Sequence, residues 1–405
     1  MATAALVGLV VLLAVSFWAP LRSVRRALAI AHLVASGYVF LVLGVIVGLA
    51  VGAAEERPLV GELGPIIAFA AGWVGFASGS RFEYRVLRTV PATAYGRALA
   101  PALAAAVVTG GVSLAVLVLA DAPVPQAIAG ALCLAAAAAS AGPTLAAVLR
   151  APRARRSRDA AAMLRMIEFS SGIADGLVVL LALLAFTLVR PGVEPSAPAV
   201  ILAVSAGGGV VLGAALWLFL GGRASDDERM LLGLGMLAMI AGFGAWLHVA
   251  PAAIAAIAGA VLANLPGARS EVLVRAVRRV ERPVVVILMA VIGMYVAGAR
   301  SWQVAVLVGV MTAVRLGAKV IAEGRPQRAL EGAASLGAPG EWALGLAPQS
   351  ILGLVVALGF FQVWRDDIGR TVLGAAAFGG LINEILGPWL LLRALRRVSE
   401  QEDPR

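Results

Sequence analysis

Residues that bind metals or form disulfides are nearly absent from this 405-residue sequence, which contains one cysteine and two histidines. A single thiol, Cys133, excludes an intrachain disulfide framework and a cysteine metal site. His32 and His248 are too few and too far apart to form a ligand cluster. We therefore expect no cofactor.

Charge is also scarce, because only 14% of the residues are charged whereas 61% are hydrophobic. This is too little polar surface for a soluble globule, so the sequence predicts an all-α polytopic membrane protein. Apolar runs of about 17 to 25 residues, each long enough to cross the hydrocarbon layer, predict thirteen transmembrane helices. They are 2–19, 28–52, 64–80, 98–120, 126–149, 163–189, 198–221, 229–247, 251–267, 283–298, 301–322, 341–363 and 371–394.

Basic residues follow the predicted topology. The first span lacks the leading positive charge of a signal peptide, and arginines follow it, so we expect a retained helix with its N-terminus outside. Alternate loops together with the C-terminus then contain 26 of the 33 basic residues, which places those loops and the C-terminus in the cytoplasm. This bias and attraction to membrane lipids explain the net charge of +10 without a nucleic-acid partner. We expect a prokaryotic plasma membrane protein.

No stretch between the predicted helices is long enough for a soluble domain. The longest are an arginine-rich loop at 151–159 and a glycine-rich loop at 324–340. We therefore expect residues 1–405 to form one transmembrane domain without a soluble regulatory domain.

One carboxylate, Asp175, lies in the apolar stretch 169–189, where no other charged residue occurs. An acid at bilayer depth costs roughly 2.5 kcal/mol or more and usually marks an ion or proton pathway, although a structural ion pair is the alternative. Burial raises the pKa of a carboxylic acid, whereas a nearby cation lowers it. A proton and a metal cation can therefore compete for Asp175. Neutral oxygen ligands are expected from nearby hydroxyls, namely Ser170, Ser171, Ser140 and Thr144.

Proline interrupts two predicted helices, at Gly142-Pro143 in the fifth span and at Pro348-Gln349 in the twelfth. Because proline removes a backbone donor, such breaks are tolerated in lipid only where other groups satisfy the backbone. Each break is followed one helix later by an intramembrane acid, Asp175 or Glu384. The two units are seven helices apart and so enter the membrane in opposite directions, which predicts an inverted repeat and a transporter binding site.

Two basic residues, Arg315 and Lys319, lie one turn apart in the eleventh span. A buried arginine stays charged and needs a partner, so we expect it to pair with Glu384 or Glu168 or to supply countercharge to Asp175. Lys319 can instead extend to the cytoplasmic interface.

Six segments together resemble the monovalent cation/proton antiporter superfamily, the sodium/hydrogen-exchanger-like proteins. They are IIAFAAGWVGFASGSRF (66–82), ASAGPTLAAVL (139–149), EFSSGIADGL (168–177), GAVLANL (259–265), VRLGAK (314–319) and GLAPQS (345–350). The resemblance covers most of the chain and rests on their order and spacing.

This resemblance implies crossed broken helices from the fifth and twelfth spans and an ion-binding core of about 98–189 and 301–394. It also implies dimerisation helices at about 1–80 and 198–298, and hence a homodimer. It places the ion-binding acid at Asp175 and the basic residue of the core at Arg315. The chain departs from the family where it has Ala174, Ser170 and Gly142 in place of common polar or acidic residues.

The sequence therefore predicts a non-enzymatic secondary transporter that exchanges Na⁺ or K⁺ for protons by alternating access. A single core carboxylate favours electroneutral exchange, unless Glu384 also titrates. The alternatives are an organic-anion or sodium-coupled symporter, a non-transporting relative and, least favoured, an intramembrane enzyme acting on lipid-linked substrates.

Overall fold

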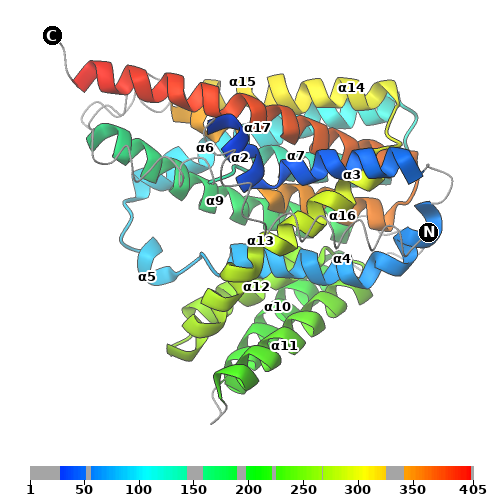
Figure 1. Ribbon diagram of the computed structural model, residues 1–405, viewed down its shortest axis with the longest axis vertical. Helices are drawn as coiled ribbons and strands as arrows, with labels where there is room; N and C mark the ends of the chain where they lie inside the picture. Colours follow the sequence, from blue (N-terminus) through cyan, green and yellow to red (C-terminus); the bar gives the residue numbers. More distant parts are fainter. Residues whose placement is uncertain are drawn as a thin grey trace.

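The protein is a bundle of packed helices (Figure 1), described by a computed structural model. The structure describes residues 28–51, 56–143, 158–188, 198–220, 225–266, 268–324 and 342–402. Within these ranges the regular elements are helices and no β-strand occurs, which confirms the all-α prediction. The first predicted span, 2–19, and the predicted ligand Thr144 lie outside the described residues.

Helical segments occupy the other predicted spans. In chain order they are α2 (Leu28–Ser36), α3 (Tyr38–Val51), α4 (Glu56–Gly79), α5 (Tyr84–Leu87), α6 (Ala92–Leu119), α7 (Val124–Ala139), α9 (Arg158–Leu188), α10 (Pro198–Leu220), α11 (Asp226–Trp246), α12 (Pro251–Asn264), α13 (Ala268–Val296), α14 (Trp302–Gly309), α15 (Arg315–Gly324), α16 (Ile351–Val363) and α17 (Asp367–Glu402). Seven of the described helices are long and apolar enough to cross a membrane unaided.

Several predicted boundaries differ from the structure, and two of these differences have a clear physical cause. The tenth span was placed at 283–298, but α13 begins at Ala268, because its first half is rich in arginine and raises no hydropathy signal. The second span is divided into α2 and α3 at Gly37, whose φ of 86° lies in the left-handed region that favours glycine.

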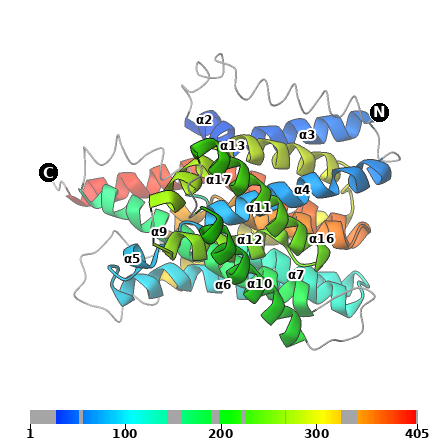
Figure 2. The same ribbon diagram turned by 90° about the horizontal axis from the view of Figure 1, so that it is seen from below.

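The helices pack as two groups. In the first, α4 packs on α11 and α12, α12 on α10, and α13 on α3. In the second, α7 packs on α6, α9 and α16, while α17 packs on α14 and α16. Figure 1 shows α10 and α11 at one edge of the molecule and α14 and α15 at the opposite edge, and Figure 2 separates α6 and α7 from α3 and α13.

Close packing in the first group depends on small residues. A Cβ added to Gly75 on α4 would overlap the main-chain carbonyl of Ala252 on α12. Absence of a side chain lets the two backbones touch, which is a common way to join helices in a membrane.

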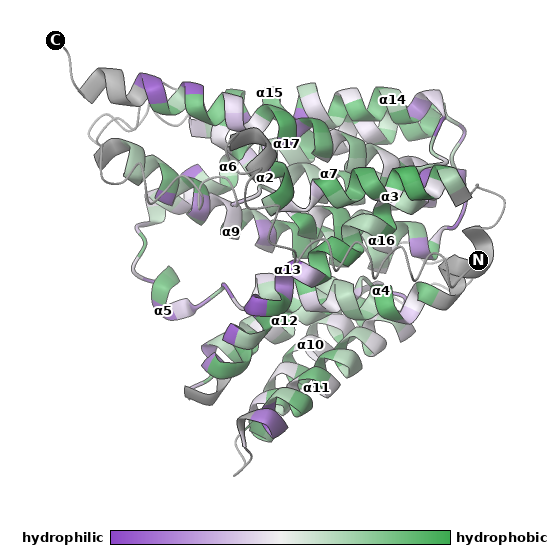
Figure 3. Cartoon of the chain, in the orientation of Figure 1, coloured by the Kyte–Doolittle hydropathy of each residue, from purple (hydrophilic) through white to green (hydrophobic). Residues whose placement is uncertain are grey.

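Apolar side chains cover the outer faces of the bundle. Large exposed residues recur along α6, α10 and α11, including Val107, Val211 and Leu231. Hydrophilic residues gather toward helix ends, as Figure 3 shows for α17 and α11. An apolar outer surface with polar ends is what a bilayer requires.

Candidate functional site

The two proline-containing segments meet inside the second helix group. Helix α7 ends at Ala139 and is followed by the non-helical residues 140–143. A 3₁₀ helix, η6 (Trp342–Leu346), and the non-helical residues 347–350 precede α16. The Gly142 N–H donates to the Pro348 carbonyl at 2.8 Å. The prediction of two crossed broken helices is therefore confirmed, and we call 140–143 with 347–350 the crossing.

Glycine and proline have distinct roles at the crossing. An added Cβ on Gly142 would lie 3.0 Å from the Gln349 carbonyl oxygen, so a side chain there would crowd the facing segment. Pro143 lacks the N–H that would continue α7. These two residues explain why the break falls at this point.

Two buried cations bind the carbonyl groups freed by the breaks. The Arg315 guanidinium donates to the carbonyls of Ala138, Ser140 and Ala347 at 2.8 to 2.9 Å. The Lys319 ammonium donates to the Ser140 carbonyl at 2.8 Å. Unpaired carbonyls at a helix C-terminus carry partial negative charge, which a cation stabilises. Arg315 and Lys319 thus hold the C-terminal ends of α7 and η6.

Arg315 makes no direct salt bridge with Glu384 or Glu168 in the described chain, although Glu384 acts on it electrostatically. Among the described residues no salt bridge joins Arg315 to a carboxylate, and its hydrogen bonds go to main-chain oxygens. Lys319 is also buried and does not extend to an interface. Both cations lie at the crossing because a π-helical turn, η4 (Val310–Val314), directly precedes Arg315 and sets the register of α15.

Asp175 lies midway along α9 and is only 1% exposed. Neither carboxylate oxygen makes a hydrogen bond to the described part of the chain, although Ser350 at the crossing lies beside it and Arg81 acts on it electrostatically. Ser350 caps α16 by accepting from the Leu352 N–H, so the carboxylate faces the positive N-terminal end of that helix. Asp175 is therefore a buried acid with the Ser350 hydroxyl beside it and no ion-pair partner in the described chain.

The predicted hydroxyl ligands have different surroundings. Ser171 donates to the Ala141 carbonyl, and Ser140 donates to the Ala137 carbonyl at 2.7 Å. Ser170 is buried and its hydroxyl has no partner among the described residues. Glu168 is half-buried two turns before Asp175 on the same helix. The structure thus brings Ser171 and Ser140 to the crossing as backbone-bound groups.

Glu384 on α17 reaches the crossing from another side. Its Oε1 accepts from the Gln349 N–H at 3.1 Å, and its Oε2 contacts Nε2 of His32 on α2. The Tyr38 side chain is buried and interacts electrostatically with both Glu384 and Arg315. Glu384 is therefore paired with a histidine and a main-chain donor.

A cavity of about 260 Å³ adjoins the crossing. Its wall includes Gly142, Pro143, Gln349 and Ser350, and it extends to the charged side chains that follow α4 and start α13, namely Arg81, Arg278, Glu281 and Arg282. We call this the basic-end cavity, because three of these four charged side chains are arginines.

Two polar contacts beside the basic-end cavity connect the residues that follow α4 to α13. Arg81 Nη2 forms a salt bridge of 3.2 Å with Glu281, and Arg278 donates to the Ser80 carbonyl at 2.9 Å. Partial burial and the Arg81 charge lower the pKa of Arg278, while Glu83 and Glu281 act in the opposite direction. This bridge joins two helices of the first group beside the cavity that leads to the crossing.

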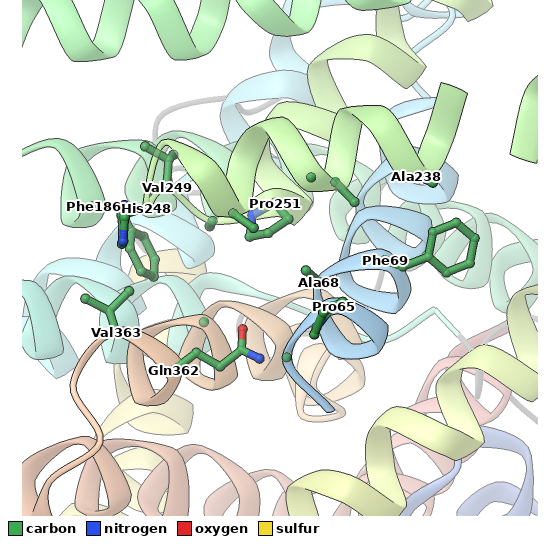
Figure 4. A pocket seen from close by; sticks show the side chains of 16 residues that line it. Pro65, Ala68, Phe69, Phe186, Ala238, His248, Val249, Pro251, Gln362 and Val363 are labelled. Carbon is green, nitrogen blue, oxygen red and sulfur yellow. The ribbon is translucent and has the colours of Figure 1, made fainter. Parts of the chain in front are cut away.

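A larger cavity of about 760 Å³ lies toward the opposite end. It separates α4, α11 and the α11–α12 connection from the ends of α9 and α16, so it lies between the two helix groups. Figure 4 shows Pro65 and Ala68 facing Pro251 and Gln362 around it. Its wall is mainly apolar, with His248 and Gln362 as polar side chains, and includes no carboxylate.

Sequence reasoning missed several residues of the site. His32, Tyr38 and Arg81 contact or influence the buried acids, but each lies far from them in sequence. The signal for His32 was an isolated polar residue at the start of an apolar span. Asn383, buried and donating to the Met311 carbonyl at 3.0 Å, gave the same kind of signal beside Glu384.

Comparison with known proteins agrees with this geometry. The family model described as sodium/hydrogen exchanger, transmembrane, matches residues 74–347. A structure of the sodium proton antiporter MjNhaP1 from Methanocaldococcus jannaschii at pH 8 superposes with a TM-score of 0.60 at 15% identity, covering 98% of this chain and 100% of that chain. An electron-microscopy map of the same antiporter gives a TM-score of 0.55 at 16% identity, with 89% and 90% covered. No functionally curated sequence matches the chain significantly.

Proposed function

The chain belongs to the sodium/hydrogen exchanger family, and from this membership we propose that it exchanges a monovalent cation, Na⁺ or K⁺, for protons across the membrane. Asp175 is the group that binds cation and proton in turn. The observation that carries the assignment is its burial without an ion-pair partner in the described chain.

The coupling of cation transport to proton transport follows from the free-energy cost of burying the charge of Asp175. An ionised carboxylate without a partner is strongly unfavourable in a low-dielectric interior, so the occluded state needs a proton or a cation on Asp175. Access then changes only when the site is occupied. One carboxylate that takes either one proton or one monovalent cation gives electroneutral, one-for-one exchange.

The neutral oxygen ligands in this proposal come from the crossing. Ser350 lies beside Asp175, and Ser171, Ser140, Ser170 and Thr144 remain candidate ligands on the neighbouring segments. The carbonyl oxygens bound by Arg315 and Lys319 lie next to positive charge, which disfavours a second cation there, so in this proposal hydroxyls and water complete the coordination of the transported cation.

Alternating access is supported by two cavities at opposite ends. The basic-end cavity reaches the crossing, and the larger apolar cavity separates the two helix groups. We propose that the second group, the core, moves against the first, the scaffold, and that the two halves of the core form the inverted repeat.

The protein in this proposal acts as a homodimer in the lipids of a prokaryotic plasma membrane, with the basic end in the cytoplasm. Light scattering that gives the mass of one chain would refute the dimer.

The decisive experiment is reconstitution of wild type and Asp175→Asn in proteoliposomes. We expect dissipation of a pH gradient by Na⁺ or K⁺ in wild type and a loss of at least 100-fold in Asp175→Asn, because an amide binds neither proton nor cation charge. Ser36→Ala, on the wall of the cavity, is the matched control and keeps activity. An imposed membrane potential leaves the wild-type rate unchanged if exchange is one for one.

The same assay separates the alternatives. Full exchange in a folded Asp175→Asn would remove Asp175 from the mechanism. Cation flux without proton flux would indicate a symporter, and no flux in the wild type would indicate a non-transporting relative.

A further inference from the structure

The membrane core contains a second buried titratable cluster that the proposed exchange does not use. His32 and Glu384 are 0% and 1% exposed, and they contact each other between α2 and α17. The other Glu384 oxygen accepts the Gln349 N–H at 3.1 Å. Nδ1 of His32 has no hydrogen-bond partner in the described part of the chain. One nitrogen of the pair is therefore open to a further proton.

Few charged groups face this pair. Tyr38 of α3 and Arg315 of α15 interact with Glu384, and Lys319 lies one turn beyond Arg315. From α13, Glu281 and Arg282 lie on the wall of the cavity that also includes Tyr38 and Gln349. Of the other elements packed on α17, α9 carries Arg165, Glu168 and Asp175 among its described side chains and α7 carries Cys133, whereas η4, η6, α14 and α16 contain no ionisable side chain.

The basic-end cavity passes within one helical turn of the pair. Ala35 and Ser36 line that cavity, and they lie three and four residues after His32, on the same face of α2. Histidine is the side chain whose unperturbed charge change falls between about pH 5 and 8. The pair thus has an open nitrogen and a nearby cavity.

We propose that His32 and Glu384 form a second proton-binding site, distinct from Asp175, and that its protonation weakens cation binding at Asp175. The inference rests on the proposed role of Asp175. Uptake of one proton at His32 Nδ1 changes the charge of the pair from −1 to 0. No covalent bond changes, and the proton comes from water in the basic-end cavity.

The coupling runs through the crossing. With the proton on His32 Nδ1, Glu384 stays ionised, and the charged imidazolium on its Oε2 binds the carboxylate more strongly than a neutral imidazole does. The imidazolium thereby competes with the Gln349 N–H for the negative charge of Glu384 and weakens the bond that holds Gln349, and the next residue, Ser350, lies beside Asp175. It also leaves Arg315 and Lys319 with less nearby negative charge, which disfavours another cation. Protonation of His32 at acid pH thus lowers the affinity of Asp175 for the cation.

Two histidines in the whole sequence make the site directly observable. The full chain is labelled with ring-¹³C histidine, reconstituted in nanodiscs, and titrated by NMR, with His248→Gln used to assign the two signals. We expect the His32 signal to titrate, and saturating Na⁺ to lower its midpoint by about 0.7 pH unit. By reciprocity of linkage this equals a fivefold change in cation affinity. Glu384→Gln should abolish the Na⁺ effect.

The outcomes separate the two proposals. A His32 signal that never titrates, or a midpoint that ignores Na⁺ while exchange still requires Asp175, would overturn the second site alone. A Na⁺ effect that persists in Asp175→Asn would show that the cation binds elsewhere, which would overturn the proposed function. A shift that occurs in wild type and disappears in both Asp175→Asn and Glu384→Gln supports both.

Discussion

At the scale of single residues, the charged side chains of the site have two roles, since Arg315 and Lys319 stabilise the structure whereas Asp175 is the proposed binding group for the transported ion. Arg315 and Lys319 are bound by main-chain carbonyls, whereas Asp175 makes no hydrogen bond to the described chain. Removing a buried donor leaves several polar acceptors unsatisfied, and each costs about 1 to 3 kcal/mol. Removing the charge of Asp175 relieves an uncompensated burial. Substitution of Arg315 or Lys319 should therefore lower the stability of the protein, whereas a neutral substitution of Asp175 should not.

We therefore predict that Arg315→Ala destabilises the protein by several kcal/mol and that Asp175→Asn leaves it at least as stable as wild type. The measurement is thermal unfolding in detergent, followed by circular dichroism. Arg282→Ala is the control, because Arg282 is exposed and makes no hydrogen bond or salt bridge in the described chain. Equal midpoints for Arg315→Ala and Asp175→Asn would contradict the prediction.

The sequence predicted the positions of these residues better than their partners. Asp175 and Arg315 stand out as charges in apolar runs, so composition alone finds them. Carbonyl oxygens carry no side-chain signature, so sequence patterns favoured a carboxylate partner for Arg315. The contact of Glu384 with His32 joins residues 352 positions apart, which no local pattern can reveal.

At the scale of helices, function depends on where regular structure stops. The breaks at 140–143 and 347–350 were predictable from the Gly-Pro and Ala-Pro pairs there, although proline alone does not decide, since Pro65, Pro101, Pro283 and Pro388 lie inside helices. The division at Gly37 and the π turn before Arg315 were not, since a lone glycine and the apolar residues VMTAV give no clear local signal. The early start of α13 was missed for the opposite reason, because charged helical turns escape a search for apolar runs.

Contact between α4 and α12 provides a test at this scale. We predict that Gly75→Ala destabilises the protein by about 1 to 3 kcal/mol, because its Cβ overlaps the Ala252 carbonyl in a packed interface. Gly64→Ala on the same helix is the matched control, since its Cβ meets no atom within 4 Å. That change should be neutral or stabilising, as alanine favours helix. Thermal unfolding of both variants measures the difference, and a stable Gly75→Ala would refute the close packing.

At the scale of the whole molecule, two helix groups meet along the larger cavity. Only one native cysteine, buried Cys133, has to be replaced before cysteine pairs are introduced. We predict that a bifunctional maleimide between Ala68→Cys on α4 and Gln362→Cys on α16 stops exchange, because it ties the groups together. Proteoliposome flux before and after cross-linking is the measurement.

The matched control joins two positions within the first group, Ala68→Cys and Ala238→Cys, which line the same cavity. Cross-linked protein of this control should keep its activity. Retained exchange in the Ala68–Gln362 pair, with complete cross-linking on a gel, would show that the groups do not move apart during transport.

The anchoring of Arg315 has a further consequence for how this fold tolerates mutation. Its ligands are main-chain oxygens, which every amino acid supplies, so the side chains at Ala138 and Ala347 are free to vary without loss of an Arg315 ligand. Substitutions there are limited by space and not by chemistry. Divergent sequences can therefore build the same crossing as long as they keep two breaks and one buried guanidinium, which is a far looser demand than a matched pair of side chains.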